Sequence, residues 1–141
     1  MEFTYIDDGI DAVVIDNFYS EEQLKQIWID LEWLTRPEIL VGEDKLVSAT
    51  HDDKIITRKS GVFLDEIFRD MIYCSIIRNF RANLQSELVS KKLLEKNALY
   101  KTLYGTNFTS YLLSYYENSD YYKPHIDSAF FTVLNYFHKE P

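Results

Sequence analysis

The chain has 141 residues, of which 46% are hydrophobic and 16% aromatic, and its formal net charge at pH 7 is −8. This apolar content is enough for one domain with a substantial core and argues against disorder. The acidic balance disfavours nucleic acids and anionic membranes as partners, because both bind a basic face. The single cysteine, Cys74, excludes an internal disulfide and a cysteine-based zinc site. Its apolar helical setting predicts a buried structural thiol.

The start of the chain lacks the features of a secretory leader, since Met1 to Thr4 are followed by the acids Asp7 and Asp8. No apolar run approaches the length of a membrane span. The chain also contains no internal repeat, low-complexity tract or linker. We therefore expect a single domain over residues 1–141 in a soluble, cytoplasmic protein.

The first elements are a strand and a helix. The β-branched run from Ala12 to Asp16 predicts a short strand. Ser20 is a good N-cap, and Gln23 three residues later completes a capping box. Apolar residues then recur at helical spacing, which predicts an amphipathic helix from Glu21 to Leu34. Trp28 and Trp33 can line a site, but packing in the core or at its boundary is the simpler expectation.

The middle of the chain has a mixed segment followed by two helical patterns. Residues 38–60 predict a long loop with one strand at Lys54 to Arg58. A second helix is predicted from Leu64 to about Arg81, and a further amphipathic stretch from Leu84 to Leu94. Either helix can bind a partner, but both are more simply the backing layer of a sheet.

The character of the sequence changes at Tyr100. Helical spacing gives way to Tyr, Phe, Thr, Leu and Val, interrupted by Gly105 and by the run Asn118-Ser119-Asp120. These are residues typical of strands and turns. The predicted fold class is therefore α+β, with helices first and antiparallel strands last.

His125 and Asp127 are the candidate metal ligands. They are two residues apart ahead of an apolar run, so on a strand both side chains leave the same face. A histidine and a carboxylate so placed are two of the three ligands of the 2-His-1-carboxylate triad of non-haem Fe(II) oxygenases. His51 and Asp53 have the same spacing but lie in a polar stretch, where a solvated loop is expected.

The segment YENSDYYKPHID resembles the first metal-binding strand of the prolyl-4-hydroxylase-like Fe(II)/2-oxoglutarate dioxygenases. The early segment VVIDNFYSEEQLKQI, Val13 to Ile27, resembles the strand and helix that open these enzymes. The resemblance implies a double-stranded β-helix (jelly roll), with a helical support layer over about residues 1–98 and the start of the core over about 99–141. It implies Fe(II) and 2-oxoglutarate, with ascorbate as an optional cofactor, and a peptidyl or small-molecule substrate.

The resemblance also implies roles for single residues. His125 and Asp127 would bind the metal, and the region of Arg58 and Lys59 would approach the substrate, although solvated charges are the simpler interpretation of that pair. Asn118 and Ser119 would stand in the turn before the metal-binding strand. Four residues would face the cosubstrate, and for each tyrosine the alternative is an aromatic of the barrel wall: Tyr116, Tyr122, Thr132 and Tyr136.

Part of the family's sequence pattern has no counterpart in this chain. Only 14 residues follow Asp127, whereas the second histidine and the Arg or Lys that pairs with 2-oxoglutarate come several strands later in the family. His138 comes too soon to match, and Ala129 stands where relatives often have Arg. We therefore expect a truncated oxygenase that is inactive alone. The alternative is a non-catalytic structural or interaction protein that retains part of the fold.

A β-helix that stops after its first strands leaves unpaired strand edges and an uncovered apolar face. The residues expected on that face are Phe131, Val133, Leu134 and Phe137. We therefore expect a homo-oligomer, most simply a two-fold dimer that pairs through Tyr111 to Phe137.

Overall fold

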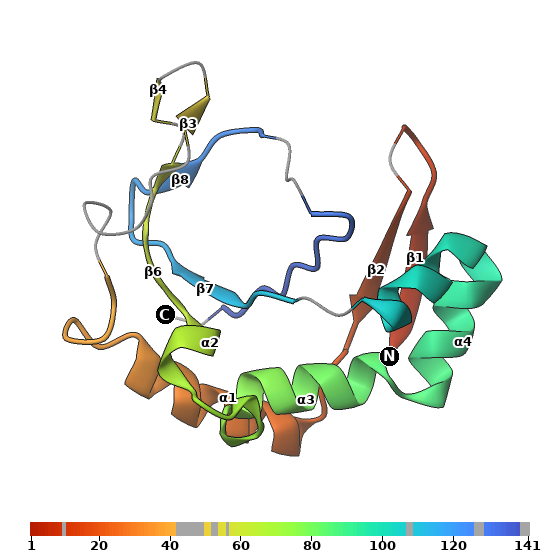
Figure 1. The fold of residues 1–141 in the computed structure, drawn as a ribbon, viewed down its shortest axis with the longest axis horizontal. Coiled ribbons are helices and arrows are strands. Elements are labelled where there is room, and N and C mark those ends of the chain that lie inside the picture. The colour runs from red at the N-terminus through yellow and green to blue at the C-terminus, as the bar shows by residue number, and fades with distance from the viewer. Residues whose placement is uncertain are drawn as a thin grey trace.

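The computed structural model describes residues 1–9, 11–41, 50, 51, 54, 55, 57–106, 109–125 and 129–138. In these ranges the chain is a mixed α+β structure in which the strands form short antiparallel pairs (Figure 1). The α+β class is therefore as predicted. Every helix among the described residues is too short or too polar to span a bilayer.

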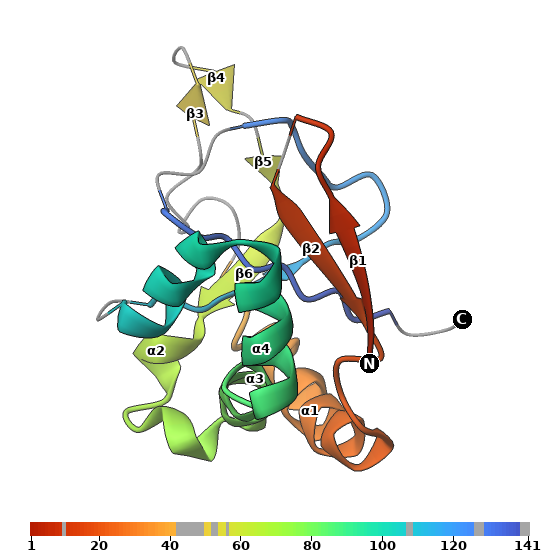
Figure 2. The ribbon, with the colours of Figure 1, turned by 90° about the vertical axis from the view of Figure 1, so that its right-hand side faces the viewer.

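The N-terminal strands form a hairpin. β1 (Glu2–Ile6) pairs antiparallel with β2 (Ala12–Asp16), the strand predicted from its β-branched residues. The hydroxyl of Tyr5 donates a hydrogen bond to the Lys92 carbonyl of α4 (Glu87–Lys96), at 3.2 Å. Figures 1 and 2 both place this hairpin beside α4, and Figure 1 shows it apart from β6.

Helix α1 (Glu21–Leu34) has the predicted bounds. The Ser20 hydroxyl accepts a hydrogen bond from the Gln23 amide, and the Gln23 side chain accepts one from the Ser20 amide. This reciprocal capping box satisfies two donors that a helix otherwise leaves unpaired at its start. The local sequence therefore determines where this helix begins.

The single helix predicted from Leu64 to Arg81 is wrong, because the chain forms three shorter pieces there. They are α2 (Leu64–Ile67), η1 (Met71–Tyr73) and α3 (Ser75–Leu84). Asp70 caps η1 by accepting a hydrogen bond from the Ile72 amide at 3.1 Å. Asp30 of α1 accepts hydrogen bonds from the amide and hydroxyl of Ser75, so a residue distant in sequence begins α3. Apolar spacing alone could not reveal these breaks.

The strand character expected from Tyr100 begins later than predicted. Residues Ala98–Gly105 form the 3-10 helix η2. Asn97 starts it, because its side-chain oxygen accepts a hydrogen bond from the Leu99 amide at 2.9 Å. A capping asparagine thus overrides the β-favouring residues that follow it.

The remaining strands pair segments that are far apart in the sequence. β5 pairs with β8, β6 with β7, and β3 with β4, all antiparallel. Their bounds are β3 (Thr50–His51), β4 (Lys54–Ile55), β5 (Thr57–Arg58), β6 (Ser60–Phe63), β7 (Leu112–Tyr115) and β8 (Tyr121–Tyr122). The strand predicted at Lys54 to Arg58 is present as β4 and β5. The prediction that helices come first and strands last is wrong, because β5 and β6 supply the partners of the C-terminal strands.

The core lies between the helices and the β6–β7 pair. Its buried residues come from α1, β6, α2, α3 and the turn before α3, with Leu113 of β7 packed against them. They are Leu34, Val62, Leu64, Cys74 and Ile77. Helices α1 and α3 therefore cover one face of this strand pair, the backing role expected of them. Cys74 is fully buried, and burial raises the pKa of its thiol, as expected for a structural cysteine.

The strand expected after Asp127 is not formed in residues 129–138, which have no regular secondary structure. Side chains hold this segment instead. Phe137 lies 5.9 Å from Tyr19 and 6.3 Å from Trp28, measured between ring centroids, and Phe131 stacks on Tyr100. Two aromatic residues of the expected strand thus form ring contacts instead: Phe137 with Tyr19 before α1 and Trp28 within it, and Phe131 with Tyr100 of η2.

Candidate functional site

His125 lies three residues beyond the end of β8. Its ring stacks on that of Tyr122, with 3.8 Å between centroids and 11° between planes. Its Nδ1 lies 2.9 Å from the Lys123 carbonyl oxygen. Because a carbonyl can only accept, Nδ1 is the donor in this contact, which in the neutral ring places the lone pair on Nε2. Histidine ligands of metals are commonly oriented in this way, with one ring nitrogen bonded to a carbonyl and the other directed to the metal.

Asp127 lies outside the described residues, so its position relative to His125 stays a prediction. His125 is exposed and is not itself in a strand. Within the described ranges, no three His, Cys, Asp or Glu side chains are grouped as a metal site requires. His51 lies in β3, a two-residue strand, where a loop was expected, and Asp53 is also outside the described residues.

Lys59 is the cationic centre of a cluster beside His125. Its Nζ donates a hydrogen bond to the Ser114 hydroxyl at 2.7 Å. The same Nζ lies 4.7 Å from the Tyr122 ring centroid and 5.9 Å from that of Tyr116, within the range of cation–π attraction. We call Lys59, Ser114, Tyr116, Tyr122 and His125 the Lys59 cluster.

Strand pairing assembles the Lys59 cluster. β6 and β7 pair with Ser60 opposite Tyr115, which brings Lys59 level with the end of β7. β5 and β8 pair with Thr57 opposite Tyr122, on the other side of Lys59. Residues more than fifty positions apart in the sequence are thereby brought to one place.

Burial raises the pKa of Tyr116, which nearby Tyr122, Tyr136 and Asp120 raise further, while a hydrogen bond from Ser114 lowers it. A phenol is already protonated at neutral pH, and the upward pKa shift extends this to higher pH, so the Tyr116 hydroxyl can donate a hydrogen bond. The predicted residues Tyr116, Tyr122 and Tyr136 thus lie close enough to interact electrostatically. Thr132 is exposed.

Arg58 has a structural partner. Its Nε lies 3.4 Å from Asp120 Oδ1, and Asp120 also accepts a hydrogen bond from the Glu117 amide at 2.9 Å. These contacts hold the turn that contains Asn118 and Ser119, as predicted for this run. Ser119 adopts a φ of 75°, which is uncommon for a residue other than glycine. The ion pair between Arg58 and Asp120 therefore fixes β5 to the turn before β8.

The sequence interpretation treated Lys59 as a solvated charge and missed the cluster around it. No local pattern predicts the cluster. Lys59 lies between β5 and β6, and the residues it contacts come from segments more than fifty residues later in the sequence.

A scan against protein-family models found no match, and searches of curated proteins and of solved structures found none either. The likeness to the dioxygenase family therefore rests on the motif residues of the sequence alone.

Proposed function

We propose that the chain belongs to an Fe(II)/2-oxoglutarate-dependent oxygenase in which His125 and Asp127 bind the metal. The observation that carries the proposal is the surroundings of His125. Its ring is stacked on Tyr122, its Nδ1 is bonded to a carbonyl, and a lysine and a second tyrosine lie alongside. In this proposal the pairs β5–β8 and β6–β7 are opening strands of a double-stranded β-helix.

The chain's own residues have defined tasks in the proposal. Fe(II) would supply the activation of O2 for oxidation of a C–H bond in a peptidyl or small-molecule substrate. Lys59, Ser114 and Tyr116 carry donors that suit a carboxylate of 2-oxoglutarate, because the Lys59 ammonium and two hydroxyl groups lie together. A third metal ligand is required, and it would come from a further polypeptide segment or a second copy of the chain.

The test is metal binding with matched histidine variants. Anaerobic titration with Fe(II) in the presence of 2-oxoglutarate should give weak binding that His125→Ala and Asp127→Ala each abolish. His51→Ala is the control, since His51 and Asp53 share the spacing of the proposed ligands. If His51→Ala weakens binding as much as His125→Ala does, the proposed site is wrong.

A non-catalytic interaction protein is the second candidate. It is favoured by the exposure of large apolar side chains in residues 129–138, where Phe130 is 75%, Leu134 67% and Tyr136 86% exposed. Exposed apolar patches commonly mark protein interfaces. Self-association without any metal binding that depends on His125 would support this candidate over the oxygenase.

A further inference from the structure

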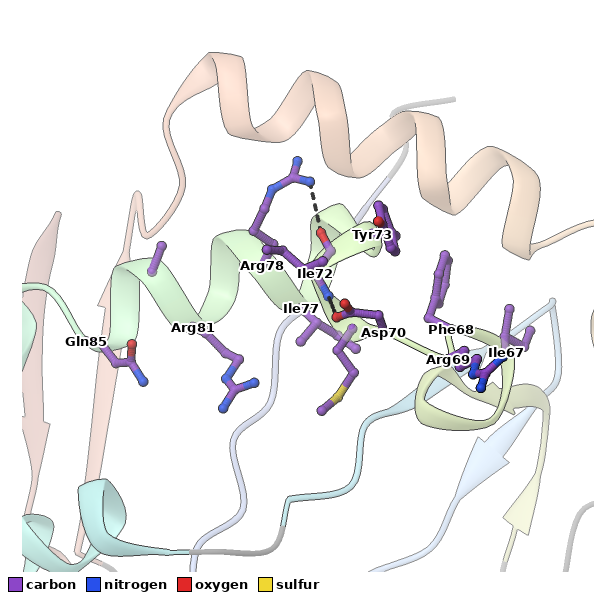
Figure 3. A pocket seen from close by; sticks show the side chains of 12 residues that line it. Ile67, Phe68, Arg69, Asp70, Ile72, Tyr73, Ile77, Arg78, Arg81 and Gln85 are labelled. Atoms are coloured by element: carbon purple, nitrogen blue, oxygen red, sulfur yellow. Dashed lines mark hydrogen bonds between the residues drawn. The ribbon is translucent and has the colours of Figure 1, made fainter.

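A groove lies between α3 and the segment formed by α2 and η1. Its volume is about 880 Å³, and it is open to solvent (Figure 3). Apolar side chains of Ile67, Phe68, Met71 and Ile77 line it. None of these residues belongs to the site proposed above.

Three arginines also line this groove. Arg78 is committed to the fold, because its guanidinium donates to the Ile72 carbonyl at 3.2 Å and to the Gln26 side chain at 2.9 Å. The guanidinium groups of Arg69 and Arg81 form no ion pair or hydrogen bond with other described residues. Each offers five N–H donors in a planar arrangement that matches a carboxylate.

The two arginines are separated along the groove. Figure 3 shows Arg81 and Arg69 on opposite sides of Ile77 and Asp70. Asp70 also lines the groove, but its carboxylate caps η1 by accepting a hydrogen bond from the Ile72 amide. A small anion would engage one guanidinium, whereas an extended or helical segment can reach both.

Exposed apolar residues extend the groove at η1. Ile72 is 58% and Tyr73 76% exposed. Apolar surface flanked by unpaired cations is unexpected on a chain with a net charge of −8, and it complements a partner that carries both apolar and acidic side chains. We propose that this groove, defined by α2, η1 and α3, binds an acidic amphipathic peptide segment of another protein.

The test uses two fluorescein-labelled peptides of 12 residues with leucines at the same positions and either Glu or Lys at the polar positions. The Glu peptide should bind at least about tenfold more tightly by fluorescence anisotropy, and the difference should shrink in high salt because exposed charges are screened. The Arg69→Gln/Arg81→Gln variant should lose at least about tenfold in affinity for the Glu peptide. Circular dichroism verifies that the variant is folded.

The matched control is Lys91→Gln/Lys101→Gln, which removes two exposed cations outside the groove, on α4 and η2. It should bind the Glu peptide as the unchanged chain does. Equal binding of the Glu and Lys peptides, or an equal loss in the two double variants, would overturn the proposal. Tighter binding of a labelled 12-nucleotide single strand than of the Glu peptide would also overturn it, by showing a site for polyanions in general.

Discussion

The imidazole of His125 lies flat against the ring of Tyr122, with 3.8 Å between the two centroids. Tyr122 belongs to β8 and is partly buried, so it gives an exposed histidine a fixed orientation. We expect Tyr122→Ala to weaken Co(II) binding at His125 by about tenfold, the lower end of the roughly 10- to 100-fold that supports of metal ligands typically contribute to affinity. Competition with a chromogenic chelator measures the change.

The matched variant is Tyr122→Phe, which retains the stacked ring and removes only the hydroxyl. Its affinity for Co(II) should stay close to that of the unchanged chain. If Tyr122→Phe and Tyr122→Ala lose affinity equally, the ring contact does not orient His125.

The isolated chain should not convert 2-oxoglutarate. In the proposed site His125 and Asp127 would be two ligands of a set of three, and two ligands give neither the geometry nor the affinity of a complete site. We expect succinate release with Fe(II), ascorbate and O2 to equal a blank without protein. Release above the blank that His125→Ala abolishes would show that a third ligand comes from within the chain or from another copy.

Local signals in the sequence were sufficient for the first part of the fold. The β-branched run of β2 and the capping box at Ser20 involve residues next to one another, and both elements have the predicted bounds. The break before α3 was not predictable in this way. It depends on Asp30, which lies 45 residues from Ser75 in the sequence.

In the candidate site, too, features set by neighbouring residues were predictable and features set by distant residues were not. The turn at Asn118 and Ser119 was predictable because those residue types favour it. The place of Lys59 depended on the pairing of β5 and β6 with the C-terminal strands, which no local pattern specifies. The segment of residues 129–138 has strand-favouring residues, yet its aromatic rings find partners such as Tyr19 and Tyr100.

Asp30 should contribute measurably to stability. Its Oδ2 accepts hydrogen bonds from the amide of Ser75 and from its hydroxyl, which is 2.6 Å away. We expect Asp30→Ala to lower the free energy of unfolding by about 1–2 kcal/mol, since the amide loses its partner at a helix start. The hydroxyl retains the Gln26 carbonyl, 2.9 Å away. Urea denaturation measures the change.

Glu22→Gln is the control for Asp30→Ala, because Glu22 is an exposed acid in the first turn of the same helix. Glu22→Gln should lower the free energy of unfolding by only about a few tenths of a kcal/mol, the size of a helix-dipole effect. Equal midpoints for the two variants would contradict a capping role for Asp30.

Tyr19 should make the chain sensitive to alkaline pH. Burial raises the pKa of Tyr19 well above its usual value, so the unfolded chain ionises first. The stability that this tyrosine contributes is fully present below about pH 10, the usual pKa of tyrosine, and is lost as pH rises above it. Tyr19→Phe should reduce that loss, as measured by urea midpoints below and above about pH 10.

Tyr100, Tyr104, Tyr111 and Tyr116 are partly desolvated and also have raised pKa values, so the Tyr19→Phe variant should retain part of the pH dependence. The same variant should lose some stability at neutral pH, because the Tyr19 hydroxyl donates to the Asn135 side chain at 3.0 Å. An unchanged slope above pH 10 would show that Tyr19 ionises equally easily in the folded and unfolded chain.

The chain should self-associate through residues 129–138. Val133 is 49% and Leu134 67% exposed, whereas Phe137 packs against Tyr19 and Trp28. The two exposed residues lie on a segment without strand pairing, and both unpaired edges and apolar patches recruit partners. We expect a two-fold dimer by light scattering at micromolar concentration, and Leu134→Asp should shift it to monomer because a charge would be buried in the interface.

Leu88→Asp is the matched control for Leu134→Asp. Leu88 is 52% exposed on α4, so the variant adds the same charge at a comparably exposed leucine away from the C-terminal segment. The dimer should persist in Leu88→Asp if the helices take no part in association. A monomer in the unchanged chain would contradict the prediction outright. Dissociation by Leu88→Asp but not by Leu134→Asp would place the interface on α4, and the apolar side chains of residues 129–138 would then need a different partner.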